Sequence, residues 1–88
     1  MEGKFFVYIL QSESDGTYYV GYSGNPEKRL LIHNSSVDSW SSRKKPWRII
    51  YKEEFTNRSD AIIREKEIKR QKSRKFIEKL ILSIGDVV

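Results

Sequence analysis

The segment at residues 61–71, which has a helical pattern, places a carboxylate within an apolar face. At about 100° per residue, Ile62 and Ile68 lie on one side of this helix and Glu65 points between them. A carboxylate in that position is costly unless it is paired or bound to a cation. Lys69 lies one turn further on and offers an ion pair at the edge of the core. Glu65 is therefore either half of a salt bridge, or a metal ligand or acid/base group.

Arg29 and His33 lie one turn apart in another predicted helix and so share one of its faces. The guanidinium presents a planar fork of donors that suits a phosphate group. A lone histidine is more often structural than catalytic, and the arginine beside it favours a functional role. The pair is a candidate phosphate-binding site.

Tyr8 and Tyr19 lie inside two β-rich runs that are expected to form a hairpin. Tyrosine is common in strands, so each of them alone is explained by packing. Both phenols would lie on one face if Tyr8 paired opposite Tyr19, and buried hydroxyls need partners. The residues that would then converge on one site are two phenols, a guanidinium, an imidazole and a carboxylate: Tyr8, Tyr19, Arg29, His33 and Glu65.

Three strands are expected to position these side chains. Residues 5–10 form an unbroken apolar run rich in aromatic and β-branched residues, which indicates a strand buried on both faces. Ser14-Asp15-Gly16 is a turn signal that joins this run to a second strand at 17–22. Residues 48–55 are again rich in β-branched and aromatic side chains and predict a third strand.

Three helices are expected as well, each beginning after a residue that can cap its first turn. The capping positions are Asn25 followed by Pro26, the turn at 56–60, and Ser73. The helices are predicted to end near Asn34, near Gln71 and at Gly85. The last helix carries an apolar stripe that predicts core packing, made of Phe76, Ile77, Leu80, Ile81 and Ile84.

The resulting element order is strand, strand, helix, strand, helix, helix. This order predicts an α/β protein of the α+β kind, with a central three-stranded, mainly antiparallel sheet flanked by helices. The serine-rich segment at 35–45 is expected to be a mobile loop. Neither an internal repeat nor a domain boundary is evident, so residues 1–88 are expected to form a single domain.

The composition excludes several classes of site. The chain has no cysteine and one histidine, which rules out disulfides, thiolate zinc sites, cysteine nucleophiles and sites built from several imidazoles. No apolar run approaches the roughly 20 residues that a membrane helix needs. The N-terminal residues lack the layout of a signal peptide. We therefore expect a soluble, cytoplasmic protein.

The charge balance points to a polyanionic partner. Seventeen Lys and Arg residues against twelve Asp and Glu residues give a net charge of +5. Basic residues are interleaved with Trp40 and Trp47, which suits a phosphate backbone with unstacked bases nearby. A solvated face on which two tryptophans anchor a loop fits equally well. The candidate nucleic-acid-binding residues are Arg43, Lys44, Lys45, Arg48, Lys69 and Lys72.

Five segments follow one another in an order and at spacings typical of a known family: Phe6-Val7-Tyr8, Tyr19-Val20-Gly21, and residues 22–34, 45–51 and 64–69. The first two resemble the paired tripeptide motifs of the GIY-YIG nucleases. The other three resemble the family's helix with Arg and His, the third strand of its short stand-alone bacterial members, and its segment with a metal-binding glutamate. The resemblance as a whole extends over about residues 5–82.

The resemblance implies hydrolysis of phosphodiester bonds of DNA with one divalent cation, Mg²⁺ or Mn²⁺. Glu65 would be the sole protein ligand of that cation, and Arg29 would hold the scissile phosphate. Tyr19 would activate the attacking water, as a phenol whose deprotonation is favoured by nearby positive charge. Tyr8 would orient the water or the phosphate, and His33 would relay a proton or bind a phosphate oxygen.

Two residues depart from the family pattern. Phe6 replaces the glycine of the first motif, and Tyr22 stands where some repair nucleases of the family carry a lysine. A separate DNA-binding domain, on which many members rely, is also missing, so a second protein that supplies target specificity is a candidate partner.

Competing hypotheses remain at this level. DNA repair, processing of branched DNA, mobile-element cleavage and restriction are all compatible with the motifs. A non-catalytic module that grips DNA or RNA is the second hypothesis. A protein whose basic face meets an acidic partner is the third.

Overall fold

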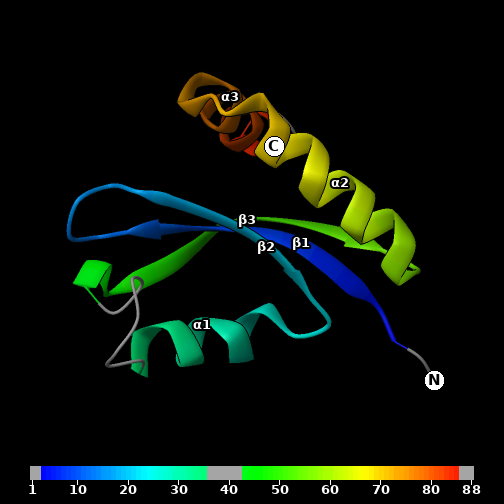
Figure 1. Cartoon of the computed structure of the whole chain (residues 1–88), viewed down its shortest axis with the longest axis horizontal. Coiled ribbons are helices and arrows are strands. Elements are labelled where there is room, and N and C mark those ends of the chain that lie inside the picture. The colour runs from blue at the N-terminus through cyan, green and yellow to red at the C-terminus, as the bar shows by residue number, and fades with distance from the viewer. Residues whose placement is uncertain (1–2, 36–42, 86–88) are drawn as a thin grey trace.

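The computed structural model describes residues 3–35 and 43–85, which contain three strands and three helices in the predicted order. The elements are β1 (Phe5–Ser12), β2 (Tyr18–Ser23), α1 (Pro26–Ser35), β3 (Trp47–Phe55), α2 (Arg58–Gln71) and α3 (Arg74–Gly85). The strands form an antiparallel sheet in the order β2-β1-β3. Helix α1 covers one face of the sheet, and α2 and α3 lie on the other side (Figure 1). The predicted α+β fold is confirmed.

The central strand β1 supplies side chains to two separate clusters. Val7 and Ile9 pack toward α2 and α3, together with apolar residues of both helices. Tyr8 and Leu10 point to the opposite face, toward α1. All four side chains are buried, because alternate residues of a strand point to opposite faces and both faces are covered here. The expectation of a strand buried on both faces is confirmed.

The register between β1 and β2 differs from the one considered above. Tyr8 pairs with Gly21, and Tyr19 pairs with Leu10. The direct pairing of Tyr8 with Tyr19 is therefore wrong, but the two phenols still share a face, since Tyr8 and Leu10 are two residues apart. Their ring centroids lie 6.4 Å apart on a diagonal. This offset leaves the position opposite Tyr8 to a glycine.

Two contacts fix α1 and β3 relative to each other. The Trp47 amide donates to Oδ1 of Asn34 over 2.6 Å, and the Asn34 side-chain amide donates to the Trp47 carbonyl over 3.0 Å. Trp47 itself is 2% exposed and packs with Tyr8 and Leu10. Trp47 is thus a core residue that holds the end of α1, and it is not available as a platform for bases. Trp40 and most of the predicted loop at 35–45 lie outside the described residues.

The three helix caps agree with the sequence. The side chains of Asn25, Asn57 and Ser73 accept hydrogen bonds from the backbone amides of Lys28, Asp60 and Phe76. Because Asn57 is the cap, α2 begins at Arg58, three residues before the predicted start. Phe76, Ile77 and Leu80 of α3 pack against the apolar cluster of the sheet, as predicted. Among the described residues, no helix has the length and apolarity needed to cross a membrane.

Candidate active site

A cleft of about 350 Å³ opens where β1, β2, the start of α1 and the middle of α2 approach one another. The residues that line it are Tyr8, Tyr19, Gly21, Tyr22, Ser23, Arg29 and Glu65. Four of the five predicted site residues are therefore lining residues, and the fifth, His33, packs against one of them. Residues that are up to 57 positions apart in the chain meet in one place.

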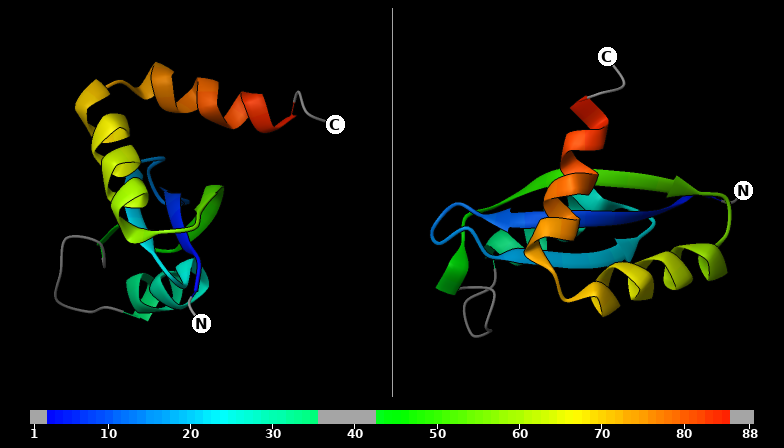
Figure 2. Two further views of the ribbon diagram at one scale, coloured as in Figure 1. Left: turned by 90° about the vertical axis from the view of Figure 1, so that its right-hand side faces the viewer. Right: turned by 90° about the horizontal axis from the view of Figure 1, so that it is seen from above.

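The topology explains how α2 contributes to a site that otherwise belongs to the α1 face. Strand β2 is an edge of the sheet, and α2 runs alongside that edge (Figure 2). Glu65 can thus reach the cleft past β2, while Arg29 approaches from α1 on the other side. The site lies at the rim of the sheet, and both helical layers are needed to complete it.

Tyr8 forms the buried floor of the cleft. Its side chain has no solvent exposure, and its phenol faces the guanidinium of Arg29, which also lines the cleft. Burial raises the pKa of Tyr8, and the nearby guanidinium of Arg29 offsets part of that rise. Negative charge on Tyr19 or Glu65 would raise this pKa further. Tyr8 is therefore held as a neutral phenol that can donate a hydrogen bond.

Gly21 gives the two phenols the space they occupy. A Cβ atom at this position would lie 2.8 Å from Oη of Tyr8 and 3.1 Å from Cε2 of Tyr19. Both distances are shorter than ordinary van der Waals contact. The glycine of the second tripeptide motif is thus required by close approach of two rings.

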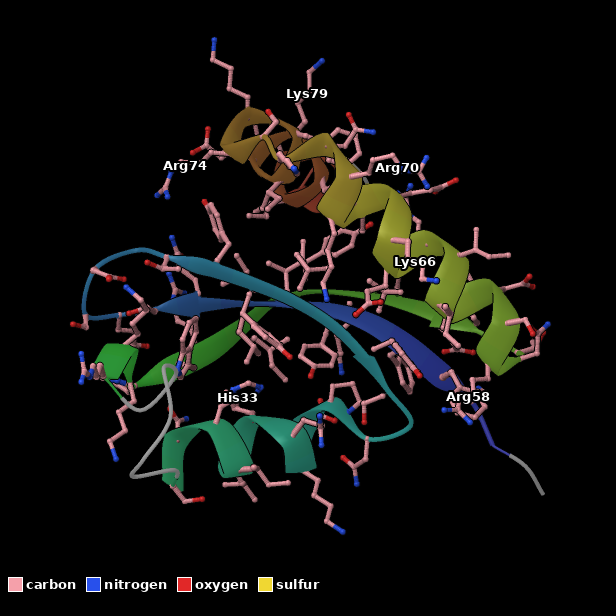
Figure 3. The ribbon with its side chains drawn as sticks, viewed as in Figure 1. His33, Arg58, Lys66, Arg70, Arg74 and Lys79 are labelled. Carbon is pink, nitrogen blue, oxygen red and sulfur yellow. The ribbon has the colours of Figure 1, made fainter. Side chains whose placement is uncertain are left out.

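His33 lies beside Tyr19, with the two ring centroids 4.6 Å apart. His33 points from α1 toward the sheet (Figure 3). The two hydrogen bonds between Asn34 and Trp47 fix the end of the helix that carries it. Burial lowers the pKa of His33, and the positive charge of Arg29 lowers it further. The imidazole is therefore neutral near pH 7 and able to accept a proton.

Glu65 forms the salt bridge that the sequence offered as one alternative, and its role as a metal ligand or acid/base group stays a prediction. Its carboxylate pairs with Nζ of Lys69 at 2.9 Å, and it also lines the cleft. The Glu65 side chain is 14% exposed and that of Lys69 is 51% exposed, so the lysine can leave the pair at little cost. Glu67 points elsewhere and pairs with Arg64.

The donor set fits a cation that needs few protein ligands. Glu65 is the one carboxylate among the cleft residues. Across residues 3–35 and 43–85, no group of three or more His, Cys, Asp or Glu side chains is placed to share a metal. Mg²⁺ suits such a site, because it keeps several waters and is commonly bound through one or two carboxylates.

The six candidate nucleic-acid-binding residues lie outside the cleft lining. Lys44 pairs with Asp15 at 2.6 Å, and Arg48 lies 3.8 Å from a carboxylate oxygen of Glu13. Arg43 and Lys45 are exposed. The remaining two, Lys69 and Lys72, line a neighbouring groove along the edge of β2.

The structure adds residues that sequence reasoning missed. Tyr22 and Ser23 line the cleft directly after the second motif. Arg58 donates to the Tyr22 hydroxyl over 3.3 Å, which brings a further guanidinium to the rim (Figure 3). Adjacency to the motif could have indicated Tyr22 and Ser23. Nothing in the sequence indicates Arg58, because its contact depends on how α2 runs along β2.

Comparison with known proteins agrees with this arrangement. The chain matches the GIY-YIG catalytic domain family over residues 4–79. It belongs to the GIY-YIG family. The two tripeptide motifs of this family are the segments of β1 and β2 that place Tyr8, Tyr19 and Gly21 in the cleft. Membership supports a nuclease-type function on a nucleic-acid substrate.

The GIY-YIG relatives of this chain are small proteins of similar length. A UPF0213 protein of Staphylococcus saprophyticus is 37% identical over 78 residues, which are 84% of this chain and 94% of the relative. One of Streptococcus pneumoniae is 36% identical over 73 residues, or 82% of this chain and 73% of the relative. The solution NMR structure of a UPF0213 protein from Bacillus halodurans has a TM-score of 0.57 at 27% identity, and covers 89% of this chain and 82% of that one.

Proposed function

We propose that this chain is a metal-dependent endonuclease that hydrolyses phosphodiester bonds of DNA. The observation that supports the proposal is the convergence of two phenols, a guanidinium and one carboxylate in a single cleft, with a neutral imidazole against one of the phenols. These groups cover the needs of phosphodiester hydrolysis, namely phosphate binding, cation binding and proton transfer.

Arg29 would bind the scissile phosphate, since it lines the cleft and its guanidinium also touches Tyr8. Glu65 would hold Mg²⁺ or Mn²⁺ after Lys69 releases its carboxylate. When bound, the cation supplies stabilisation of negative charge on the phosphate and on the leaving oxygen. The basic residues Arg43, Lys44, Lys45 and Arg48 would contact the DNA backbone further away.

We assign the role of general base to Tyr19. Tyr19 is half-buried and lies against the imidazole of His33, whereas Tyr8 is fully enclosed and its pKa is raised by burial. A phenolate at Tyr19 would take a proton from the attacking water, and His33 would accept a proton in turn. Tyr8, as a neutral phenol, would orient the water or the phosphate.

Cleavage assays with matched variants test the proposal. Supercoiled, branched and single-stranded DNA would be incubated with Mg²⁺, with Mn²⁺ or with EDTA. We expect cleavage that requires the cation and that disappears in Glu65→Ala. The companion variant Lys69→Gln removes the ion-pair partner and should retain cation-dependent cleavage. Equal cleavage by the wild type and Glu65→Ala would show that Glu65 is not the ligand.

The ion pair between Glu65 and Lys69 favours a second candidate, a non-catalytic DNA-binding module. In that case the carboxylate serves the packing of α2, and the basic residues carry the function. DNA binding that weakens steeply with salt, together with no cleavage under any cation, would favour this candidate.

Among biological settings, we propose repair or processing of branched DNA in the cytoplasm, with target choice supplied by a separate protein. Preference for branched over linear duplex DNA in the same cleavage assay would support this setting.

A further inference from the structure

A second groove, of about 440 Å³, lies between β2 and the junction of α2 with α3. Its floor is apolar and includes Tyr18, Val20 and Ile77. Three cationic side chains line it as well, and no acidic residue is among the lining residues. These cations are Lys69, Lys72 and Arg74. An apolar floor bounded by positive charge fits a base with its phosphate attached.

The cations are placed by the turn between the two helices. Lys72 adopts a left-handed conformation, with φ of 47°, and donates its amide to the Lys69 carbonyl, which ends α2. The chain then turns sharply (Figure 2), and Arg74 begins α3 beside Tyr18 of β2. The Arg74 guanidinium lies over the ring of Tyr18, 4.7 Å from its centroid.

The acidic partners of these cations compete weakly with a phosphate. Arg74 lies 3.4 Å from Glu78, but both side chains are about half exposed or more, so their attraction is small. Lys69 pairs with Glu65, which the proposed function requires to be released for a cation. Among the residues that the structure describes, no carboxylate lines this groove beside Lys72.

The groove adjoins the candidate active site. Tyr19 lines both hollows. The Glu65–Lys69 pair spans the boundary between them, since Glu65 lines the active-site cleft and Lys69 lines the groove. A nucleic-acid strand with a phosphate at Arg29 would therefore have the groove directly beside it, across the edge of β2.

We propose that this groove is a subsite for one unpaired nucleotide of DNA next to the scissile phosphate. Its base would lie on the apolar floor against Tyr18, in the place that the Arg74 guanidinium takes over the ring in the free protein. The displaced guanidinium and Lys72 would then contact the phosphate. A volume of about 440 Å³ suits a ligand the size of one nucleotide. A base can enter only after leaving its stack, which costs least in a strand that is already unpaired. The position next to the scissile phosphate rests on the proposed function, whereas binding in the groove does not.

Binding without cleavage tests the subsite. Fluorescence anisotropy would be measured in EDTA with a dye-labelled single strand and with the blunt duplex of the same sequence. We expect Tyr18→Ala to weaken single-strand binding on the order of tenfold, as for loss of one base–aromatic stack. Tyr18→Phe keeps the ring and should restore the affinity. The double variant Lys72→Asn/Arg74→Gln should weaken single-strand binding by a similar factor.

Lys79→Gln is the control for loss of charge alone. Lys79 is exposed on α3 and points away from the sheet (Figure 3), so this variant should bind as the wild type does. Circular dichroism would verify that each variant is folded. Wild-type affinity in Tyr18→Ala, or an equal loss for single strand and duplex, would overturn the subsite.

Different experimental results would contradict the subsite and the proposed function. Single-strand binding that depends on Tyr18, in a protein that cuts no DNA, would support the subsite and overturn the nuclease. Cation-dependent cleavage that Tyr18→Ala leaves unchanged on both single-stranded and duplex DNA would overturn the subsite and leave the nuclease standing.

Discussion

The two faces of the sheet differ in what they bury. On the α2 and α3 face, Val7 and Ile9 pack against Ala61 and Ile68, and the buried phenol of this cluster, Tyr51, donates a hydrogen bond to Glu53 at the surface. The α1 face buries a phenol and an indole and places an imidazole beside them. Phenols and imidazoles are costly to bury without partners, whereas aliphatic side chains gain free energy from burial. The α1 face therefore carries most of the polar groups of the candidate site, which Glu65 of α2 completes.

Each strand contributes side chains to both faces of the sheet. Alternate residues of β1 and β2 belong to different faces, so neighbouring positions are expected to respond to substitution in different ways. Changes on the α1 face should affect activity more than stability, and changes on the α2 and α3 face should do the reverse. Tyr19→Phe and Ile68→Ala test this expectation directly, whereas Gly21→Ala and His33→Asn test how the α1 face is packed.

The largest effect is expected for the phenol assigned as base. Tyr19→Phe keeps the ring against His33 and removes the hydroxyl, so activity should fall by about 10²–10⁴-fold while the melting temperature changes little. Steady-state cleavage rates and thermal unfolding would measure both. Tyr8→Phe is the companion variant and should lower activity less. The reverse order of the two variants would transfer the role of base to Tyr8.

A core substitution on the other face should have the opposite profile. Ile68 is 2% exposed, and Ile68→Ala should lower the free energy of unfolding by about 2–5 kcal/mol because it leaves a cavity. Ile63 on the same helix is 57% exposed, and Ile63→Ala should change the free energy of unfolding by less than about 0.5 kcal/mol. Urea unfolding measures both values. Similar losses in the two variants would show that α2 is not packed as described.

Gly21 tests the contact between the phenols and β2. Gly21→Ala places a methyl group 2.8 Å from Oη of the enclosed Tyr8, and should cost about 1–3 kcal/mol of stability. The control is Gly24→Ala, where the nearest atom is the Lys4 carbonyl oxygen at 3.6 Å. Chemical unfolding of both variants gives the difference. An unaffected Gly21→Ala protein would mean that Tyr8 moves freely, contrary to its burial.

The smallest effect concerns pH. The pKa of His33 is lowered in the folded state, so the unfolded chain binds a proton more readily. The associated stability is present above about pH 6.5 and is lost as the pH falls through the folded value. Between about pH 7.5 and about pH 5.5, the urea midpoint of the wild type should fall slightly more than that of His33→Asn. Parallel changes in the two proteins would contradict a neutral, enclosed imidazole.

The sequence sufficed for the element order and for much of the candidate site. Strand and helix periodicities are local properties, and the caps at Asn25 and Ser73 lie next to the helices they begin. Glu65 stood out because its place on an apolar helix face needs a partner, and the structure gives it both Lys69 and the cleft. Tyr8 and Tyr19 were predicted as site residues chiefly from the family resemblance, since a tyrosine in a strand is common.

The strand register and the long-range contacts were not predicted, because they depend on tertiary geometry. Strand register depends on how the hairpin closes, and the structure places Tyr19 opposite Leu10 instead of Tyr8. The contact of Arg58 with Tyr22 joins residues 36 positions apart and exists because α2 runs beside an edge strand. Trp47 is likewise buried where its backbone amide donates a hydrogen bond to the Asn34 side chain. No periodicity in the sequence encodes these contacts.

The position of the cleft at the rim of the sheet has a consequence for partly folded chains. Tyr8, Tyr19 and Arg29 come from one contiguous segment, whereas Glu65 arrives only when α2 docks along β2. A chain with α2 detached would keep its phosphate-binding groups and lose its carboxylate. Under the proposed function, such a chain should bind DNA without cutting it. Parallel measurement of DNA binding and cleavage at rising urea concentration should show cleavage disappearing first.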